Sequence, residues 1–194
     1  MYLNREKGGR TLEQNHLWTG GAVLNQTRDA AFEQLMQTQM ARVYRLCCWL
    51  VKDRTAAEDI TQEVFLKAYK HLSAFRGDSR IETWLYRIAV NESKRYLRSG
   101  LFRKRFSVTQ ANREACADIE SEVVQKDERA ALSRLIDRLP FRHKQVLILH
   151  YYEELRAETI AEILGITPGA VYTRLHRARE KVKALMRKEE ERWI

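Results

Sequence analysis

The chain has 194 residues, a formal net charge of +9, and only 8 glycines and 2 prolines. That length is enough for one domain or two small ones, and long periodic segments with little glycine or proline predict an all-α fold. The positive charge favours a polyanionic partner, such as nucleic acid or an anionic membrane surface, but a merely soluble basic protein fits it equally well.

Cysteine and apolar patterns narrow the class further. Cys47, Cys48 and Cys116 lack zinc-type spacing, and their odd number argues against a disulfide framework. We expect a reducing, cytoplasmic location with Cys47 and Cys48 as small helix residues; a redox-sensing pair is the alternative. The N-terminal segment has no signal-peptide core, and no apolar run, residues 146–149 included, is long enough to span a bilayer. No metal, cofactor or direct membrane insertion is expected.

The N-terminal half predicts a mobile extension followed by three helices. Residues 1–27 mix glycine, asparagine and charge without a period. A capping box of Thr55 and Glu58 predicts a helix that starts there and runs to about residue 72. Another box, of Ser79 and Glu82, predicts a helix that runs to about residue 98. Ahead of both, apolar residues recur at steps of three and four, as on a core-facing helix: Phe32, Leu35, Met36, Met40, Val43, Cys47, Leu50 and Val51.

The second half begins with a segment of different character. Residues 100–127 lose the helical period and carry three basic residues at 103–105, which predicts a flexible linker. Periodicity then returns, stops at Pro140, and resumes in a further apolar helix. The simplest organisation is two small helical domains, residues 28–99 and 128–194, joined by that linker.

The segment "TIAEILGITPGAVYTRLHRA" has the spacing of a helix-turn-helix. Ala161 is small where the two helices would cross, and Gly165 tolerates the positive φ of a tight turn. Thr167 can cap the second helix, with Pro168 suited to its first turn. The second helix would be pinned by Ile166, Val171 and Leu175.

Polar and basic residues of that second helix would then face outward or along its flanks. Arginine suits guanine edges, hydroxyls suit several base edges, and basic groups suit phosphates. A charged, solvated last helix is the alternative interpretation. The residues concerned are Tyr172, Thr173, His176, Arg177 and Arg179.

Two surfaces of the N-terminal half also suggest partners. The helix after Ser79 has one apolar face and one face that carries Trp84 among cations, a pattern that suits unpaired nucleic acid because bases stack on aromatics. A core position for Trp84 with solvated cations is equally compatible with the pattern. One helix earlier, Asp59, Gln62 and Glu63 form an acidic face, which suits either water or a basic protein surface.

The residues then match a known family. Residues 57–98, "AEDITQEVFLKAYKHLSAFRGDSRIETWLYRIAVNESKRYLR", closely resemble region 2 of the extracytoplasmic-function (ECF) sigma factors, within the sigma-70 family. Residues 135–182, "LIDRLPFRHKQVLILHYYEELRAETIAEILGITPGAVYTRLHRAREKV", resemble their region 4. Two independent blocks in the family's order make the resemblance specific.

The resemblance implies a dissociable subunit of bacterial RNA polymerase, not an enzyme, that directs the core enzyme to promoters. The second domain would contact the β flap of the polymerase. Many relatives are held inactive by a membrane-linked anti-sigma factor, and such a partner is implied here. The first domain would dock on the clamp coiled coil of the β′ subunit through Asp59, Gln62, Glu63 and Phe65.

The resemblance also implies two sets of contacts with promoter DNA. The part that reads and opens the −10 element matches Phe75, Arg76, Gly77, Asp78, Ser79, Arg80, Trp84, Arg87, Asn91 and Lys94. The reader of the −35 element matches Thr167, Tyr172, Thr173, Arg174, His176, Arg177 and Arg179. Two positions depart from the family pattern, with Arg156 in place of a serine or threonine helix cap and Glu154 where glycine is frequent.

Two other functions fit parts of the sequence. A helix-turn-helix transcriptional regulator with a helical sensing or dimerisation domain would share the C-terminal unit, although residues 28–99 lack the alternating strands of a receiver domain. An enzyme acting on nucleic acid has little support, because no metal-spaced carboxylates, Ser/His/Asp set or phosphate-binding glycine loop occurs in the sequence.

Overall fold

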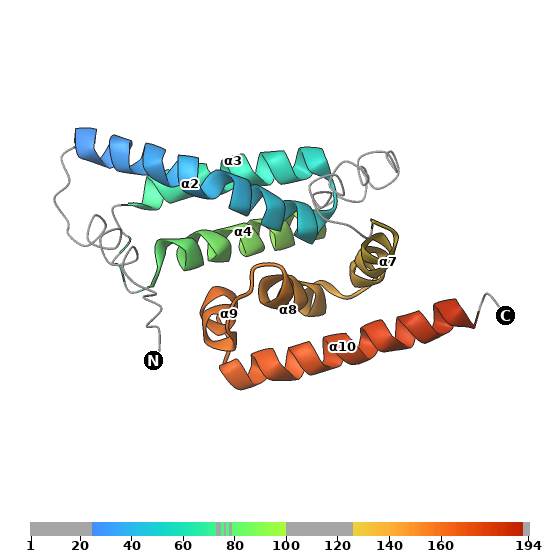
Figure 1. Cartoon of the computed structure of the whole chain (residues 1–194). Helices are drawn as coiled ribbons and strands as arrows, with labels where there is room; N and C mark the ends of the chain where they lie inside the picture. Colours follow the sequence, from blue (N-terminus) through green and yellow to red (C-terminus); the bar gives the residue numbers. More distant parts are fainter. Residues whose placement is uncertain (1–24, 73–74, 76, 78, 100–125, 192–194) are drawn as a thin grey trace, which may run out of the picture.

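The structure, a computed structural model, describes residues 25–72, 75, 77, 79–99 and 126–191. Every regular element in these ranges is an α-helix, as predicted (Figure 1). Arg76, Asp78, Cys116 and most of the predicted extension and linker lie outside the described residues. In chain order the helices are α2 (Asn25–Val51), α3 (Arg54–His71), α4 (Ile81–Arg98), α7 (Lys126–Asp137), α8 (Phe141–Tyr151), α9 (Ala157–Leu164) and α10 (Pro168–Glu190).

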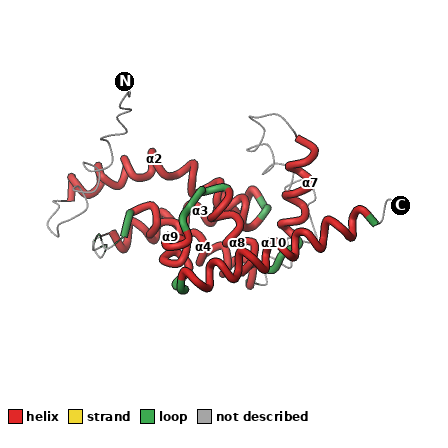
Figure 2. The backbone as a smooth tube through the Cα atoms, turned by 60° about the horizontal axis from the view of Figure 1, so that its bottom comes forward, coloured by secondary structure: helices red, strands yellow, loops and turns green. Residues whose placement is uncertain are grey.

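The helices form two groups that pack against each other. Helices α2, α3 and α4 pack on one another, and α10 packs along α8 and α9. Figure 1 shows α4 between the α2–α3 pair and the second group, and α4 contacts α9 while α2 contacts α8. The turned view of Figure 2 shows the same helices, with short loops where the connection between two helices is described. The two groups therefore touch directly along α4 and α2.

One continuous apolar core runs through both groups. Burying a large aliphatic side chain contributes about 1.5–3 kcal/mol, so this core is the main source of stability. Cys47 and Cys48 are buried within it, and burial raises the pKa of Cys47 to about 12, which keeps this thiol protonated and unreactive. The largest fully buried side chains include Leu46, Leu50 and Leu85 in the first group and Ile148, Leu149, Ile160 and Val171 in the second.

Two helix starts differ from the predictions. Asp53, not Thr55, caps α3, because its Oδ1 accepts a hydrogen bond from the Ala56 backbone N–H at 3.0 Å. Lys52 in the left-handed region (φ 54°) ends α2 immediately before this cap, so the connection is shorter than predicted. Helix α4 begins at Ile81 with Arg80 in the cap position and without a side-chain cap, so the predicted Ser79 box is also wrong.

The first helix begins earlier than predicted. Helix α2 starts at Asn25, so residues 25–27 belong to this helix and not to the extension. Within the described ranges, no helix combines the length and hydropathy needed to cross a membrane.

Candidate nucleic-acid and polymerase interfaces

The turn of the helix-turn-helix forms as predicted. Gly165 ends α9 in the left-handed region with φ 62°, a backbone conformation that L side chains rarely adopt. A Cβ at Gly165 would meet no atom within 4 Å, so the requirement for glycine comes from the backbone and not from crowding. Thr167 caps α10 by accepting a hydrogen bond from the Ala170 N–H at 3.2 Å, and Pro168 occupies the first turn.

The recognition helix α10 is held by one buried stripe. Val171, Leu175 and Ala178 are buried at steps of four and three and face α8 and α9. This orientation leaves the opposite side of the first turns open to solvent, where Tyr172 is 60% exposed. Thr167, Thr173, His176 and Arg177 are also exposed, and Arg174 is half-buried.

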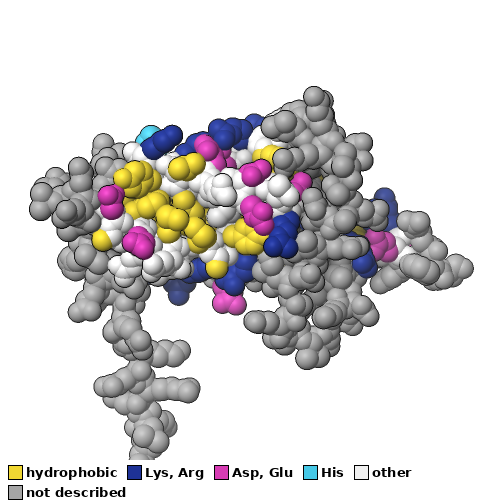
Figure 3. Space-filling model, turned by 90° about the horizontal axis from the view of Figure 1, so that it is seen from above, with side chains coloured by type: hydrophobic (Ala, Val, Ile, Leu, Met, Phe, Trp, Pro, Cys, Tyr) yellow, Lys and Arg dark blue, Asp and Glu magenta, His cyan; other side chains and the backbone are white. Residues whose placement is uncertain are grey.

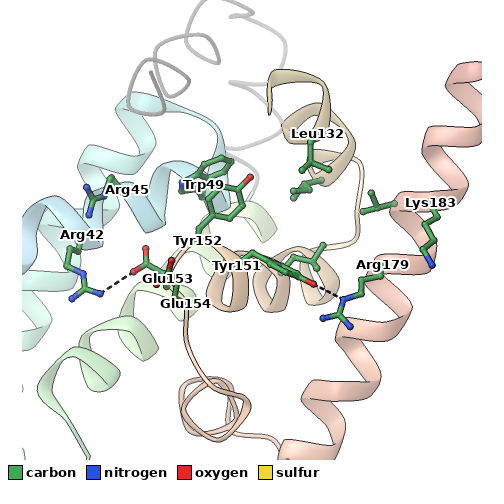
Figure 4. A pocket seen from close by; sticks show the side chains of 13 residues that line it. Arg42, Arg45, Trp49, Leu132, Tyr151, Tyr152, Glu153, Glu154, Arg179 and Lys183 are labelled. Atoms are coloured by element: carbon green, nitrogen blue, oxygen red, sulfur yellow. Dashed lines mark hydrogen bonds and ion pairs between the residues drawn. The ribbon is translucent and has the colours of Figure 1, made fainter. Parts of the chain in front are cut away.

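Arg179 differs from the other predicted DNA contacts on α10. Its Nε donates a hydrogen bond to the Tyr151 hydroxyl at 2.8 Å, and its guanidinium lies 5.6 Å from the centroid of the same ring. Figure 4 shows this side chain directed toward α8. Arg179 is thus engaged by the protein, while Arg177, two residues earlier, remains on the exposed side.

The turn that precedes the helix-turn-helix carries both departures from the family pattern. Glu154 adopts the left-handed region with φ 52°, a conformation that glycine adopts more readily than other residues. Arg156 occupies the N-cap position of α9 without a side-chain cap bond, so α9 lacks the polar cap that a serine or threonine would provide.

The predicted −10 face lies along α4. Arg80, Arg87, Asn91 and Lys94 are exposed on this helix. Trp84 is half-buried and packs against the core, and its ring lies 5.2 Å from that of Phe75 at an interplanar angle of 42°. The structure therefore combines the two interpretations of Trp84: part of the indole supports the fold and part remains accessible.

Two residues of the preceding loop complete the described part of that face. Gly77 is exposed with φ 75°, and Ser79 is half-buried. A positive φ at Gly77 allows a tight bend ahead of α4.

On α3, the members of the predicted polymerase face differ in exposure. Asp59 and Gln62 are exposed, but Phe65 is only 4% exposed and makes an edge-to-face contact with Phe32 of α2 at 6.3 Å. Leu66, the next residue, is 56% exposed. Leu66 stands four residues after Gln62 and shares its face of the helix.

Glu63 is partly neutralised by its neighbours. Its carboxylate lies 3.5 Å from the Lys67 ammonium and 3.8 Å from the Arg95 guanidinium. Arg95 belongs to α4, where it also pairs with Glu92, and Lys67 of α3 pairs with the same Glu92. The Lys67–Glu92 and Arg95–Glu63 pairs therefore tie α3 to α4. Glu63 therefore has a structural role in addition to any external one.

An apolar surface extends over the same side of the molecule. Figure 3, the view from above onto α2 and α3, shows apolar side chains gathered there with acidic and basic groups around them. The exposed large apolar residues of these helices are Met40, Leu66 and Tyr69. Such patches on soluble proteins commonly mark interaction surfaces.

Comparisons with known proteins agree with this geometry. The family model for Sigma-70 region 2 matches residues 35–101, and that for Sigma-70, region 4 matches residues 129–182. The RNA polymerase sigma-H factor of Pseudomonas aeruginosa is 38% identical over 166 residues, which cover 80% of this chain and 86% of that protein. The ECF RNA polymerase sigma factor SigW of Bacillus subtilis is 30% identical over 167 residues, which cover 81% and 89% of the two chains.

Solved structures share the fold. CnrH in complex with the cytosolic domain of CnrY superposes with a TM-score of 0.65 at 22% identity, over 90% of this chain and 97% of that one. The sigma factor RpoE of Bartonella quintana, in complex with the anti-sigma factor NepR, gives a TM-score of 0.59 at 20% identity, over 80% and 96%. With both regions matched in order and relatives aligned over most of their length, the chain belongs to the ECF sigma factors of the sigma-70 family.

Proposed function

We propose that this sigma factor binds core RNA polymerase and directs transcription initiation at promoters that it recognises through two separate DNA elements. The observation that carries the proposal is the presence of two different exposed DNA-type faces, one on α4 and one on α10, in separate helical groups. We take the two domains to be residues 28–99 and 128–194, joined by a linker at 100–127.

The −35 element is contacted by the first turns of α10. An α-helix fits the major groove of B-DNA, and the residues exposed there offer hydroxyls and cations for base edges and phosphates. Tyr172, Thr173, His176 and Arg177 have the exposure that this role needs. Arg174 and Thr167 lie at the edge of this exposed face. Arg179 either contacts DNA after its hydrogen bond to Tyr151 breaks or supports the helix through that bond.

The −10 element is contacted by α4 and the loop before it. Exposed Arg87 and Lys94 can hold a strand by its phosphates, and Asn91 lies between them in the sequence. The Trp84–Phe75 pair offers an aromatic surface on which an unpaired base can stack, and stacking on a side chain is worth about 1–3 kcal/mol per base. This gain offsets part of the cost of opening the duplex.

The β′ clamp coiled coil is bound by the exposed side of α3. Asp59 and Gln62 supply polar contacts, and Leu66 supplies the apolar contact that the sequence had assigned to Phe65. Removing an exposed apolar side chain from water is favourable, so Leu66 is expected to matter more than the half-neutralised Glu63. The second domain contacts the β flap.

An anti-sigma factor is the remaining partner that we propose. RpoE of Bartonella quintana, which shares the fold, was solved in complex with the anti-sigma factor NepR, and CnrH was solved with the cytosolic domain of CnrY. A cavity of about 860 Å³ lies between the two helical groups of this chain and is lined by both, so a partner seated there would contact both domains.

Titration of the purified chain into bacterial core RNA polymerase, followed by run-off transcription on fragmented genomic DNA, tests the function. Stable binding with new discrete transcripts is expected. Specific duplex binding by the chain alone, with no binding to core polymerase, would instead favour a helix-turn-helix regulator. Core polymerase without the chain is the baseline.

A further inference from the structure

Gly169 is the second residue of the recognition helix α10, and nothing in the described fold requires a glycine there. Its φ does not lie in the left-handed region, unlike the φ of Gly77 and of Gly165. A Cβ at Gly169 would meet no described atom within 4 Å. Because glycine is less favourable in a helix than alanine, it makes the start of α10 less stable, and the described part of the chain gives no reason for it.

Gly169 also lies at the centre of the exposed side of α10. Residues three, four and seven positions further along a helix are neighbours on its surface, and here these are Tyr172, Thr173 and His176. All of them are exposed, as Gly169 is, and they lie opposite the buried stripe that faces α8 and α9. Figure 1 shows α10 at the outer edge of the molecule, on the far side of α8 and α9 from α4. Gly169 therefore leaves a gap among the side chains of the face assigned to the −35 element.

Thr173 stands beside this gap with its hydroxyl proton already used. The Oγ1 of Thr173 donates a hydrogen bond to the carbonyl oxygen of Gly169 at 2.9 Å. A threonine hydroxyl has a single hydrogen, so this bond leaves the oxygen able only to accept from a partner outside the helix. The groups that the two residues offer to DNA are then the CH₂ of Gly169, the methyl of Thr173 and one acceptor oxygen.

An adenine–thymine pair matches this set of groups. In the major groove, thymine presents its C5-methyl and adenine presents the N6 amino donor. The thymine methyl can enter the gap at Gly169 and contact the methyl of Thr173, while the adenine amino group donates to the Thr173 hydroxyl. A side chain at position 169 would fill the gap, because carbon atoms in contact need about 3.5–4.0 Å between their centres. A guanine–cytosine pair has an amino donor but no methyl group, so it would leave the gap empty.

We propose that Gly169 and Thr173 form a notch on α10 that accepts the C5-methyl of one thymine in the −35 element. Gly169 is then a position that determines specificity, although it has no side chain with which to contact a base. The base that the notch reads rests on the proposed function. That the fold has no need of the glycine is independent of it.

The Gly169→Ala variant tests the notch, with stability and DNA binding measured separately. The melting temperature of the free variant should be unchanged or higher by about 1–4 °C, because alanine fits this backbone and restricts the unfolded chain. Fluorescence anisotropy of the reconstituted holoenzyme, on a −35 duplex from a promoter found by run-off transcription, should show affinity lower by about tenfold, the cost of one misfitted contact. A pull-down verifies that the variant still binds core polymerase. A clearly lower melting temperature, or an unchanged affinity for the duplex, would overturn the inference.

Removal of single methyl groups from the DNA identifies the base. Each thymine of the −35 duplex is replaced in turn by deoxyuridine, which lacks only the C5-methyl. We expect one replacement to lower the affinity of the unmutated holoenzyme severalfold, and the same replacement to have little effect on Gly169→Ala or on Thr173→Ser, which removes the methyl of Thr173. Thr173→Val keeps a methyl at that place and is the matched control, so its affinity should still depend on the thymine methyl.

Two outcomes separate this inference from the proposed function. An unmutated holoenzyme that binds the promoter but is insensitive to every replacement, or as sensitive as Gly169→Ala at each thymine, would overturn the notch and leave the proposed function standing. Failure of the unmutated chain to bind core polymerase or promoter would overturn the proposed function and the assigned base with it. The melting temperatures would still decide whether the fold needs the glycine.

Discussion

Arg177 and Arg179 stand two residues apart on the recognition helix but in different surroundings. Arg177 is exposed beside the open face of α10, whereas Arg179 is hydrogen-bonded to Tyr151 on the flank. Counting the basic residues of a helix therefore overestimates how many of them can contact DNA. Which arginine points outward depends on the neighbour that each can reach.

Arg177→Ala should weaken binding of the holoenzyme to a −35 duplex more than Arg179→Ala does. Loss of a base contact costs about 1–3 kcal/mol, and loss of a phosphate contact lowers the slope of log affinity against log salt by about 1. Fluorescence anisotropy across a salt series measures both quantities. Equal losses for the two variants would contradict the distinction drawn from the structure.

Phe65 and Leu66 form a second pair of neighbours with opposite surroundings. Leu66→Ser should reduce affinity for core polymerase while leaving the melting temperature almost unchanged, because the side chain is exposed. Phe65→Ala should instead lower the free energy of unfolding by about 3–5 kcal/mol, because it leaves a cavity in the core. Pull-down with core polymerase measures the affinity of both variants, and thermal melts measure their stability. Undiminished core binding by Leu66→Ser would remove it from the interface.

At the scale of the element, the turn between α8 and α9 has a strained residue. A non-glycine residue in the left-handed region costs about 1–2 kcal/mol, and glycine recovers part of this at the expense of chain entropy. Glu154→Gly should therefore raise the free energy of unfolding by about 0.5–1 kcal/mol, since Glu154 has φ 52°. Urea unfolding measures the change, and a destabilised Glu154→Gly protein would show that the carboxylate has an unrecognised role.

His143 of α8 is a buried titratable residue, and we expect it to make the stability of the fold depend on pH. The side chain of His143 is 3% exposed, and this burial is the main reason that its pKa lies below 6.5. The charges of Arg142, Lys181 and Arg177 also lower the pKa, whereas a hydrogen bond to the Arg174 backbone raises it. The unfolded chain binds this proton more readily than the folded chain does, so stability is complete above pH 6.5 and falls as the pH drops below it.

The His143→Gln variant should lose this part of the pH dependence. We expect the unmutated protein to unfold at lower urea between pH 7.5 and pH 5.5, and the variant to show a smaller difference over the same interval. Parallel urea titrations at the two pH values provide the measurement. An identical acid response in both proteins would assign the effect to other groups.

The elements differ in how far their sequence determines them. The helix-turn-helix was predictable because Gly165, Thr167 and Pro168 each encode a local backbone requirement. The start of α3 could not be predicted, because Asp53 and Thr55 are both good helix caps and only the turn at Lys52 selects between them. The sequence also did not predict that Leu66 would be exposed and Phe65 buried. Successive residues on a helix lie only about 100° apart, so the packing of the core determines which of the two is buried.

At the scale of the whole molecule, the packing of the two groups left no local signal in the sequence. The Tyr86 hydroxyl of α4 donates a hydrogen bond to Glu153, 67 residues away in the turn after α8, and neither residue stands in a motif that predicts a partner. The contact depends on the path of the chain between α4 and α7 and on the fit of two surfaces. Sequence patterns thus predicted two domains, and the structure was needed to see them joined.

The central claim is that one chain contacts two distant promoter elements through two separated surfaces. The most direct test is a footprint of the reconstituted holoenzyme on a promoter found by run-off transcription, with hydroxyl radicals to detect protected backbone and permanganate to detect unpaired thymines. We predict a protected tract near −35, a second near −10, and permanganate-reactive thymines only in the second. A single continuous protected tract without reactive thymines would contradict the account.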